Sequence, residues 1–440
     1  MSPQQVFQGD WTWTGESFAS DVQIAVDERG KIMDVGPLGL KPTMRFPRHA
    51  LLPGFVNTHS HAFQRGLRGK GESFPEGGGS FWTWREAMYR LVQEIDSDAF
   101  YRLCLQTFRE MRAAGITTVG EFHYFHHSGD ASDYAFDELA LRAAAAVGIR
   151  IVLLNAFYKT GGIGQPLSAP QQRFRTESPE AYWEHLDSLR DKLDPNTQTL
   201  GTVVHSIRAA KPDDIAALHL ESVKRSLPFH IHVEEQRKEI EDSITSYGKP
   251  PMALLHGVLS GCANVTAIHC THTDPHDMER FLDAGGRVCL CPLTEANLGD
   301  GIPALPGLHA IEGRIALGTD SNARICMTEE MRWLEYGQRL ANQARGVHTD
   351  AQGRSAPALL RIATENGAAS LGIEAGRLVP GTFADFVAVD LANPGLRGCD
   401  ETTLLESFIF GSGNDAIAGT CVGGKWEEVR GETSEVRSEK

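Results

Sequence analysis

The segment LLPGFVNTHSHAFQR, residues 51–65, passes from an apolar run into a polar stretch with two histidines two positions apart. In a β-strand, residues i and i+2 point to the same side, so His59 and His61 could face one ligand at the end of this strand. Taken alone, an HxH pair is more often two unrelated histidines of the core or the surface. The rest of the chain decides between the two interpretations.

Short apolar runs recur along the middle of the chain, and amphipathic helical patterns such as 98–115 separate them. The runs lie at 51–56, 116–122, 150–155, 201–206, 228–232, 265–269, 287–291 and 314–319. Apolar strands that alternate with helices predict a parallel sheet covered by helices. Eight such units predict an α/β fold of the (β/α)8 TIM-barrel type. A doubly wound sheet is the alternative, but no glycine-rich phosphate loop follows any of these runs.

The two ends of the chain differ from its middle: both contain short patterns typical of β-strands. Residues 22–36 read as two alternating strands around a turn at 27–30, and short β-branched runs with glycines recur at 381–390 and 417–429. This pattern predicts a small β-sandwich domain built from residues 1–50 and 376–430. The catalytic barrel would then span residues 51–375, and the polar residues 431–440 would form a flexible tail.

Composition excludes several classes of function. Lys and Arg number 42 against 57 for Asp and Glu, and the resulting net charge of −15 disfavours general binding to nucleic acid or to anionic membranes. The N-terminus lacks the features of a secretory signal, and no apolar run approaches the ~20 residues that cross a bilayer. The eight cysteines, mostly single within apolar runs, indicate buried thiols in a reducing compartment. We therefore expect a cytoplasmic enzyme with a small-molecule substrate.

Polar residues gather where the predicted strands end. They are His59, His61, Glu121, His123, Tyr124, His205, Arg208, His230, His232, Glu235, His269 and Asp320. Active sites of (β/α)8 barrels are built at the carboxyl ends of the strands, so these side chains should converge on one pocket.

A metal site is the simplest use of this set. His59, His61, His232 and Asp320 could hold Zn²⁺ or a similar divalent ion with a position left for water. A barrel hydrolase with two metals commonly has a modified lysine at the end of strand 4, where this chain reads TVVHSIR (202–208). The sequence therefore predicts one metal ion per subunit. His230 is expected to pack nearby rather than to bind the metal.

The remaining residues suggest hydrolysis at a trigonal carbon. A bound divalent ion lowers the pKa of its water towards neutrality, and Glu235 could move the protons. His269 could donate to the substrate where charge develops, and Asp320 could both bind the metal and accept a proton from the water.

Two segments near the predicted pocket have plainer explanations. The pattern HYFHH (123–127) could suggest a second metal, but such short patterns more often reflect loop polarity or a substrate contact. Residues 80–92 form an amphipathic aromatic helix, and residue type alone would place its Arg85 at the surface. The glycine-rich loop at 76–80 could be a flexible segment near the mouth.

The motifs HSH, HxxE, HCTH and GTDS after strands 1, 5, 6 and 8 resemble the mononuclear-zinc deaminases of the amidohydrolase superfamily. Longer phrases are similar to the formimidoylglutamate deiminase family of histidine degradation over essentially the whole chain. These phrases are NTHSHAFQRG, GSFWTWREAMYRL, VGEFHYFHH, HSIRA, HIHVEEQRKEI, LTEANLGDG and MRWLEYGQR.

That family hydrolyses N-formimidoyl-L-glutamate to N-formyl-L-glutamate and ammonia. The resemblance implies zinc ligation by His59, His61, His232 and Asp320, proton transfer by Glu235, and His269 beside the formimidoyl group. It implies that the glutamate part is held by Gln64, Arg85, Tyr124, His205 and Arg208. Guanidinium groups bind carboxylates in bidentate fashion, so two arginines suit a substrate with two carboxylates.

One departure from the family concerns the loop after the last strand. A histidine often follows DS there, whereas this chain reads DSNARICMTEE (320–330). Asn322 and Arg324 are therefore expected to affect selectivity, and a formimidoyl amino acid other than glutamate is an alternative substrate. A deaminase of a heterocyclic amine and a metal-free binding protein on a barrel scaffold are the alternative functions. The oligomeric state is open, with a homodimer as one option.

Overall fold

The computed structural model describes residues 3–70, 72, 74, 77–129, 132–305 and 313–429. One of its two eight-stranded sheets is entirely parallel, and the spatial order of its strands follows their order in the chain. They are β6 (Phe55–Ser60), β7 (Ile116–His123), β8 (Arg150–Phe157), β9 (Gln198–Ser206), β10 (Phe229–Val233), β11 (Val265–His269), β12 (Arg287–Leu290) and β13 (Ile315–Leu317). A bridge between Ser60 and Asp320 brings the last strand back to the first. The predicted barrel is confirmed.

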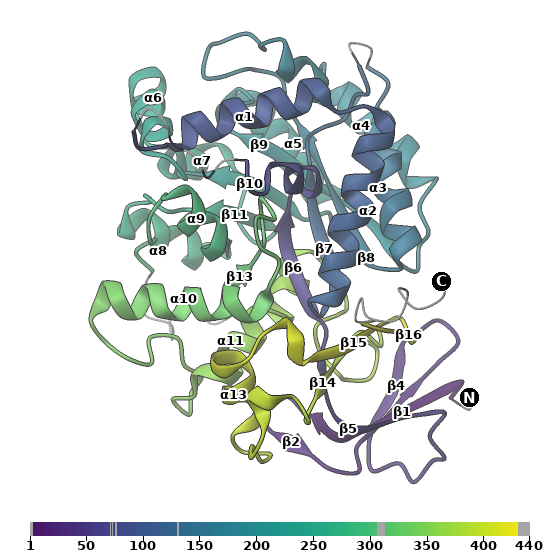
Figure 1. The fold of residues 1–440 in the computed structure, drawn as a ribbon. Helices are drawn as coiled ribbons and strands as arrows, with labels where there is room; N and C mark the ends of the chain where they lie inside the picture. The colour runs from purple at the N-terminus through teal and green to yellow at the C-terminus, as the bar shows by residue number, and fades with distance from the viewer. Residues whose placement is uncertain are drawn as a thin grey trace, which may run out of the picture.

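The described residues form thirteen α-helices, most of which surround the barrel strands (Figure 1). They are α1 (Phe81–Glu94), α2 (Ser97–Ala113), α3 (Ala135–Val147), α4 (Pro179–Arg190), α5 (Pro212–Lys224), α6 (Arg237–Tyr247), α7 (Pro251–Val258), α8 (Pro275–Asp283), α9 (Pro292–Leu298), α10 (Met327–Asn342), α11 (Ser355–Ile362), α12 (Glu365–Ser370) and α13 (Leu404–Gly411). Helix α2 shows how the sequence sets such an element: the Asp96 side chain caps its first turn by accepting from the Ala99 amide at 2.7 Å. Its buried face then packs against the barrel.

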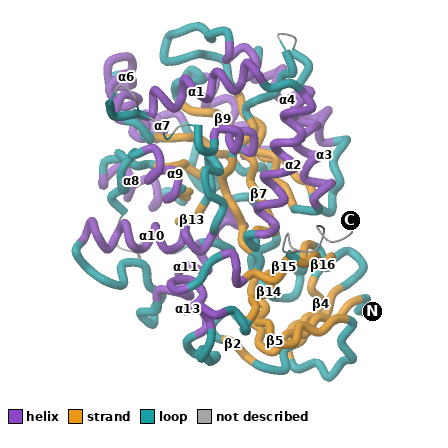
Figure 2. The backbone as a smooth tube through the Cα atoms, viewed as in Figure 1, coloured by secondary structure: helices purple, strands orange, loops and turns teal. Residues whose placement is uncertain are grey.

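The second sheet is separate and mixed, and both ends of the chain contribute to it. Its strands are β1 (Gln5–Trp13), β2 (Phe18–Ala19), β3 (Gln23–Val26), β4 (Ile32–Gly36), β5 (Met44–Pro53), β14 (Phe386–Asp390), β15 (Ile417–Val422) and β16 (Lys425–Glu428). Strands β5 and β14 join the N-terminal and C-terminal parts in the antiparallel sense. Figure 2 shows this β-rich unit at one end of the helix-covered barrel. The predicted small β unit from both termini is confirmed; the tail at 431–440 lies outside the described residues.

The first apolar run is divided between the two sheets, whereas the sequence analysis treated residues 51–56 as one barrel strand. Leu52 pairs with Val387 in the terminal sheet, and the barrel strand β6 starts only at Phe55. Gly54 lies between them, and a Cβ at this position would approach the Thr117 hydroxyl oxygen to 2.2 Å. Gly54 thus allows the chain to pass close to Thr117 between the two sheets. The barrel strand begins at Phe55, four residues after the start of the apolar run, and includes His59.

The described part of the chain contains no helix with the length and apolarity that a membrane span needs. All eight cysteines are free thiols, and only Cys399 is not buried. These thiols act as small apolar side chains within the fold.

Candidate active site

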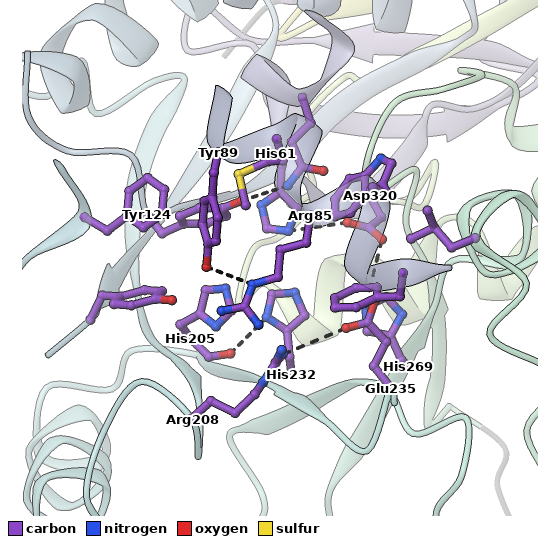
Figure 3. Close-up of a pocket in the computed structure, with 17 residues that line it drawn as sticks. His61, Arg85, Tyr89, Tyr124, His205, Arg208, His232, Glu235, His269 and Asp320 are labelled. Carbon is purple, nitrogen blue, oxygen red and sulfur yellow. Dashed lines mark hydrogen bonds and ion pairs between the residues drawn. The ribbon is translucent and has the colours of Figure 1, made fainter. Parts of the chain in front are cut away.

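Three imidazoles and one carboxylate meet at the carboxyl end of the barrel. His59 Nε2 lies 3.2 Å from His232 Nε2 and 3.4 Å from Asp320 Oδ1. His61 Nε2 lies 3.3 Å from the same Asp320 oxygen, and all four residues are buried. In Figure 3, His61, His232 and Asp320 border the pocket. Strands β6 and β10 and the turn after β13 thus bring together residues that are more than 250 positions apart.

The geometry of this cluster fits a divalent ion such as zinc. Ligand atoms about 2.0–2.1 Å from zinc lie about 3.3 Å from one another in a tetrahedron, which matches the separations above. The Nδ1 atoms of His61 and His232 donate to the carbonyl oxygens of Phe122 and His205 at 2.8 and 2.9 Å. These bonds place the lone pairs of both rings on Nε2, towards the centre of the cluster. The donor set can therefore hold a metal ion.

Burial also keeps the imidazoles neutral. It lowers the pKa of His59 to about 3 and that of His61 to about 4, and it holds the pKa of His232 well below its ordinary value. Burial would raise the pKa of Asp320, but the hydrogen bond and the electrostatic interaction with His59, together with the charge of His269, outweigh it and hold that pKa below its ordinary value. Neutral imidazoles and an ionised carboxylate are the protonation states that a metal ion requires.

The seam between the first and last barrel strands sets the positions of these ligands. The Asp320 amide donates to the His59 carbonyl at 3.0 Å, and the His61 amide donates to the Asp320 carbonyl at 2.9 Å. A Cβ on Gly318 would come within 2.7 Å of the His59 Cβ, so only glycine allows this approach. Asp320 itself has a φ of +46°, a left-handed conformation that turns its carboxylate towards the histidines.

A second group of ionisable side chains adjoins the cluster. His269, at the end of β11, has its Nε2 3.9 Å from Glu235 Oε1 and 3.9 Å from Asp320 Oδ2. Its Nδ1 lies 3.3 Å from Glu295 Oε1. All of these side chains are buried. His269 thus bridges the cluster and the Glu235 carboxylate.

The buried charges in this group shift the pKa values of His269 and Glu235. Burial lowers the pKa of His269, but the Glu235, Glu295 and Asp320 carboxylates outweigh it and raise the pKa to about 10. Burial raises the pKa of Glu235, against the opposing effects of His269 and Arg208. A protonated imidazole therefore faces a carboxyl group whose affinity for a proton is increased. Such a pair is suited to general acid–base chemistry.

Arginines, amides and hydroxyls line the opposite side of the cavity. Arg85 projects from α1 and donates from Nε to the Tyr89 hydroxyl at 2.8 Å. Arg208 follows β9, with its Nε 3.3 Å from Glu239 Oε1 and its Nη2 3.9 Å from Glu235 Oε2. Figure 3 shows the two guanidinium groups on the same side of the pocket as His205.

Gln64 and Tyr124 complete this side. Gln64 donates from its amide nitrogen to the Tyr124 hydroxyl at 2.8 Å, while its buried amide oxygen has no hydrogen-bond partner. The His205 ring lies 5.1 Å from the Tyr124 ring. A buried amide oxygen without a donor, next to two arginines, indicates room for a polar ligand.

One cavity unites these features. Among the predicted site residues, those that line it are His61, Gln64, Arg85, Tyr124, His205, Arg208, His232, Glu235, His269 and Asp320, and His59 lies buried beneath them. The sequence analysis missed other lining residues: Phe81, Trp84, Met88, Tyr89, Tyr158, Phe174 and Leu298. Two signals could have found some of them. Tyr89 lies one helical turn after Arg85, and Tyr158 directly follows β8, as the other site residues follow their strands.

Two histidines of HYFHH, His123 and His126, form a separate buried cluster around Asp137, and this group could hold a metal ion as well. His123 Nε2 and His126 Nδ1 both lie 2.9 Å from Asp137 Oδ1, and His185 Nε2 lies 2.8 Å from Asp137 Oδ2. Separations of this length are direct hydrogen bonds to the carboxylate. The cluster therefore ties α3 to β7, and only Tyr124 of this motif lines the cavity.

His230 was expected to pack nearby rather than to bind the metal. Its Nε2 contacts the Ser370 carbonyl at 3.1 Å, and His230 is not among the described residues that line the cavity.

Asn322 and Arg324 were expected to affect substrate selectivity. Neither is among the described residues that line the cavity. Arg324 is mostly exposed and donates from Nη2 to Glu329 at 2.7 Å, while Asn322 is completely buried below the pocket floor.

Comparisons with known proteins agree with this architecture. The family model described as "Amidohydrolase family" matches residues 50–426. The chain is 37% identical over 417 residues to formimidoylglutamate deiminase of Pseudomonas aeruginosa, covering 93% of this chain and 92% of the relative. An amidohydrolase structure from Brucella melitensis superposes with a TM-score of 0.86 at 32% identity, covering 96% of this chain and 94% of that one.

The fold also extends to more distant proteins. The structure of an adenosine deaminase from Xanthomonas campestris with bound zinc has a TM-score of 0.78 at 21% identity, and 96% of this chain and 92% of that chain are covered. At this identity the similarity concerns the fold alone. The family match over most of the chain, together with the full-length relatives, shows that this chain belongs to the amidohydrolase family.

Proposed function

We propose that this protein is a zinc-dependent formimidoylglutamate deiminase, which hydrolyses N-formimidoyl-L-glutamate to N-formyl-L-glutamate and ammonia in histidine degradation. One observation carries the proposal: a cluster that fits one metal ion and two arginine side chains, Arg85 and Arg208, line the same cavity. The name of the relative that is 37% identical supports the same activity.

Zinc would be held, one ion per subunit, by His59, His61, His232 and Asp320. Three histidines and one carboxylate are a donor set that zinc prefers, and the relative with adenosine deaminase activity carries zinc. When bound, the ion lowers the pKa of water and polarises the group under attack. The protein contributes the geometry, because hydrogen bonds from His61 and His232 to backbone carbonyls fix the orientation of both rings.

Glu235 would move the protons of the reaction. In the addition step a water oxygen bonds to the formimidoyl carbon, and Glu235 accepts a proton from that water, with Asp320 available as a second acceptor. The substrate enters with its formimidoyl group protonated, so this addition leaves a neutral tetrahedral carbon that carries a hydroxyl and an amino group. In the elimination step Glu235 gives its proton to the amino group, the C–N bond breaks and ammonia departs. The hydroxyl oxygen becomes the formyl carbonyl as Asp320 accepts its proton. Protonated His269 would donate a hydrogen bond near the developing charge.

Arg85 and Arg208 would bind the two carboxylates of the glutamyl part. Burial would lower the pKa of Arg208, but the Glu239 and Glu235 carboxylates outweigh it and raise this pKa, so the guanidinium group stays charged. Gln64, Tyr124 and His205 would complete the polar surface around the substrate. A protein with a net charge of −15 needs such local cations to attract a substrate with two carboxylates.

Replacing Arg208 with alanine is expected to raise KM for N-formimidoyl-L-glutamate about 10- to 100-fold, because a hydrogen bond to a charged group contributes about 1.5–3 kcal/mol. R208K should recover only part of the loss, since lysine keeps the charge but not the planar fork. Steady-state kinetics measure both effects. Arg190, exposed on α4, offers the matched control R190A. An unchanged KM in R208A would remove Arg208 from the carboxylate site.

A comparison of substrates tests the proposed function itself. Purified protein should release ammonia from N-formimidoyl-L-glutamate and leave adenosine, guanine and cytosine unchanged, because two arginines in the cavity favour an anionic substrate over a neutral ring. A coupled assay for ammonia measures both rates. Activity on a ring substrate alone would support the alternative, another deaminase of the superfamily that acts on a heterocyclic amine.

Several finer assignments accompany this proposal. Residues 1–50 and 376–430 would form the small domain, and residues 51–375 the catalytic barrel. The enzyme would act in the cytoplasm on a small anionic molecule and would not bind nucleic acid. The existence of a homodimer is a separate question that size-exclusion chromatography with light scattering can answer.

A further inference from the structure

The side-chain amide of Asn322, close to the predicted metal cluster, forms hydrogen bonds through both its nitrogen and its oxygen. Its side chain is fully buried, and its φ of +57° is a left-handed conformation that asparagine tolerates better than most residues. The amide nitrogen lies 3.1 Å from Ser60 Oγ, 3.1 Å from the His61 carbonyl oxygen and 3.0 Å from the Asp320 carbonyl oxygen. One side-chain amide therefore holds the backbones of two predicted ligands.

A second set of bonds holds Asn322 in place. Its amide oxygen accepts from the Thr319 hydroxyl at 2.7 Å, and that hydroxyl accepts from the Asn57 amide nitrogen at 2.7 Å. The Thr319 backbone amide donates to the Asn57 amide oxygen at 2.9 Å. Asn57 and Thr319 belong to opposite sides of the barrel seam. These hydrogen bonds therefore link the first barrel strand to the last one twice, through Asn57 and through Asn322.

The location of this network gives it a particular consequence. Ser60 and Asp320 form an isolated bridge between the first and last strands, whereas the other neighbouring strands of the barrel pair over several residues. The side-chain amides of Asn57 and Asn322 supply hydrogen bonds between these two strands, where backbone pairing is limited to one bridge. At this point His61 Nε2 lies 3.3 Å from Asp320 Oδ1. A shift along this seam would change that separation directly.

We propose that Asn322 is a positioning residue for the metal centre, which sets the separation of His61 and Asp320 by holding both of their carbonyl groups. This inference rests on the proposed function, because it concerns the affinity of the zinc site. Asn322 touches neither the metal ligand atoms nor the cavity; it acts through the backbone. Supporting residues of this kind typically contribute 10- to 100-fold to metal affinity.

The variant that tests the inference is Asn322→Gly. Glycine accepts a positive φ without strain, so this change removes the amide but allows the backbone conformation. The dissociation constant for zinc, measured by competition with a chromophoric chelator, should rise about 10- to 100-fold. The visible absorption of the cobalt-substituted protein should also change, since it reports the ligand geometry. Asn322→Asp, nearly the same size but without N–H donors, should weaken zinc binding as well.

Asn393 provides a matched control in the small domain. It is also buried, and its side chain accepts from the Gly395 amide at 2.9 Å and donates to Asp415 at 2.9 Å. Asn393→Gly should lower the Tm of zinc-free and zinc-loaded protein alike and leave zinc affinity unchanged. Asn322→Gly should instead reduce the gain in Tm that zinc produces.

The possible results separate the inference from the proposed function. If Asn322→Gly or Asn322→Asp binds zinc with wild-type affinity and gives the wild-type cobalt spectrum, the positioning role is overturned. An equal loss of Tm with and without zinc would also overturn it, because a purely structural residue behaves in that way. If the wild-type chain binds no divalent ion at all, the proposed metal centre fails, and the inference fails with it.

Discussion

Replacing Glu235 with glutamine is expected to lower kcat about 10²- to 10⁴-fold, while the zinc content of the protein stays at the wild-type level. The amide has nearly the shape of the carboxyl group but cannot accept a proton from water or pass one to the leaving nitrogen. Glu235 is buried between His269 and Arg208, and no described metal-ligand cluster includes it. Initial rates with N-formimidoyl-L-glutamate and metal analysis of the same samples measure the two quantities.

The exposed Glu241 on α6 gives the matched control for this change. E241Q makes the same chemical replacement outside the cavity, and its kcat should equal that of the wild type. A variant E235Q that retained more than a tenth of the wild-type kcat would show that another group carries the protons. Asp320 would then be the first candidate, because its carboxylate lies 3.9 Å from the same His269 nitrogen, Nε2, that Glu235 approaches.

Removing the metal is expected to reduce activity to the background rate, and one equivalent of zinc per subunit should restore it. Without an ion, the buried lone pairs of His59, His61 and His232 face one another and the Asp320 carboxylate, so the zinc-free protein should also unfold at a lower temperature. Dialysis against a chelator, titration with zinc and thermal melting measure these effects. Full activity in protein shown to be metal-free would contradict the proposed chemistry.

Two histidines of β10 provide an internal comparison for the metal prediction. H232A removes a predicted ligand and should abolish zinc binding, whereas H230A removes only the contact with the Ser370 carbonyl. H230A should therefore lower stability and still bind zinc. A protein with H232A that kept one tightly bound zinc would exclude His232 from the ligand set.

Much of the site could be predicted from the sequence because of one geometric rule. The eight apolar runs alternate with helical patterns, and parallel strands place their carboxyl ends at one rim. Polar residues directly after the strands, from His59 to Asp320, therefore pointed to one cavity. Arg85 was different: its residue type suggested the surface, and only the resemblance to a family placed it at the substrate.

Other features depended on contacts that no local pattern encodes. The run 51–56 is divided between two sheets because Leu52 pairs with Val387, which is far away in the chain. His230 does not line the cavity, because its imidazole contacts the carbonyl of Ser370, 140 residues later in the chain. Asn322 was expected to alter substrate selectivity, but its side-chain amide is hydrogen-bonded to acceptors more than 250 residues away in the sequence.

The sequence by itself determined the type of fold, the residues available at the rim and the chemistry they allow, because hydrophobic periodicity and side-chain type are local properties. Only the tertiary structure decided which imidazole nitrogens face the metal position, how far apart the ligands lie and what holds the barrel seam. Those quantities follow from strand register, bulges and hydrogen bonds between distant segments, and a change of one residue in register redirects every side chain of a strand.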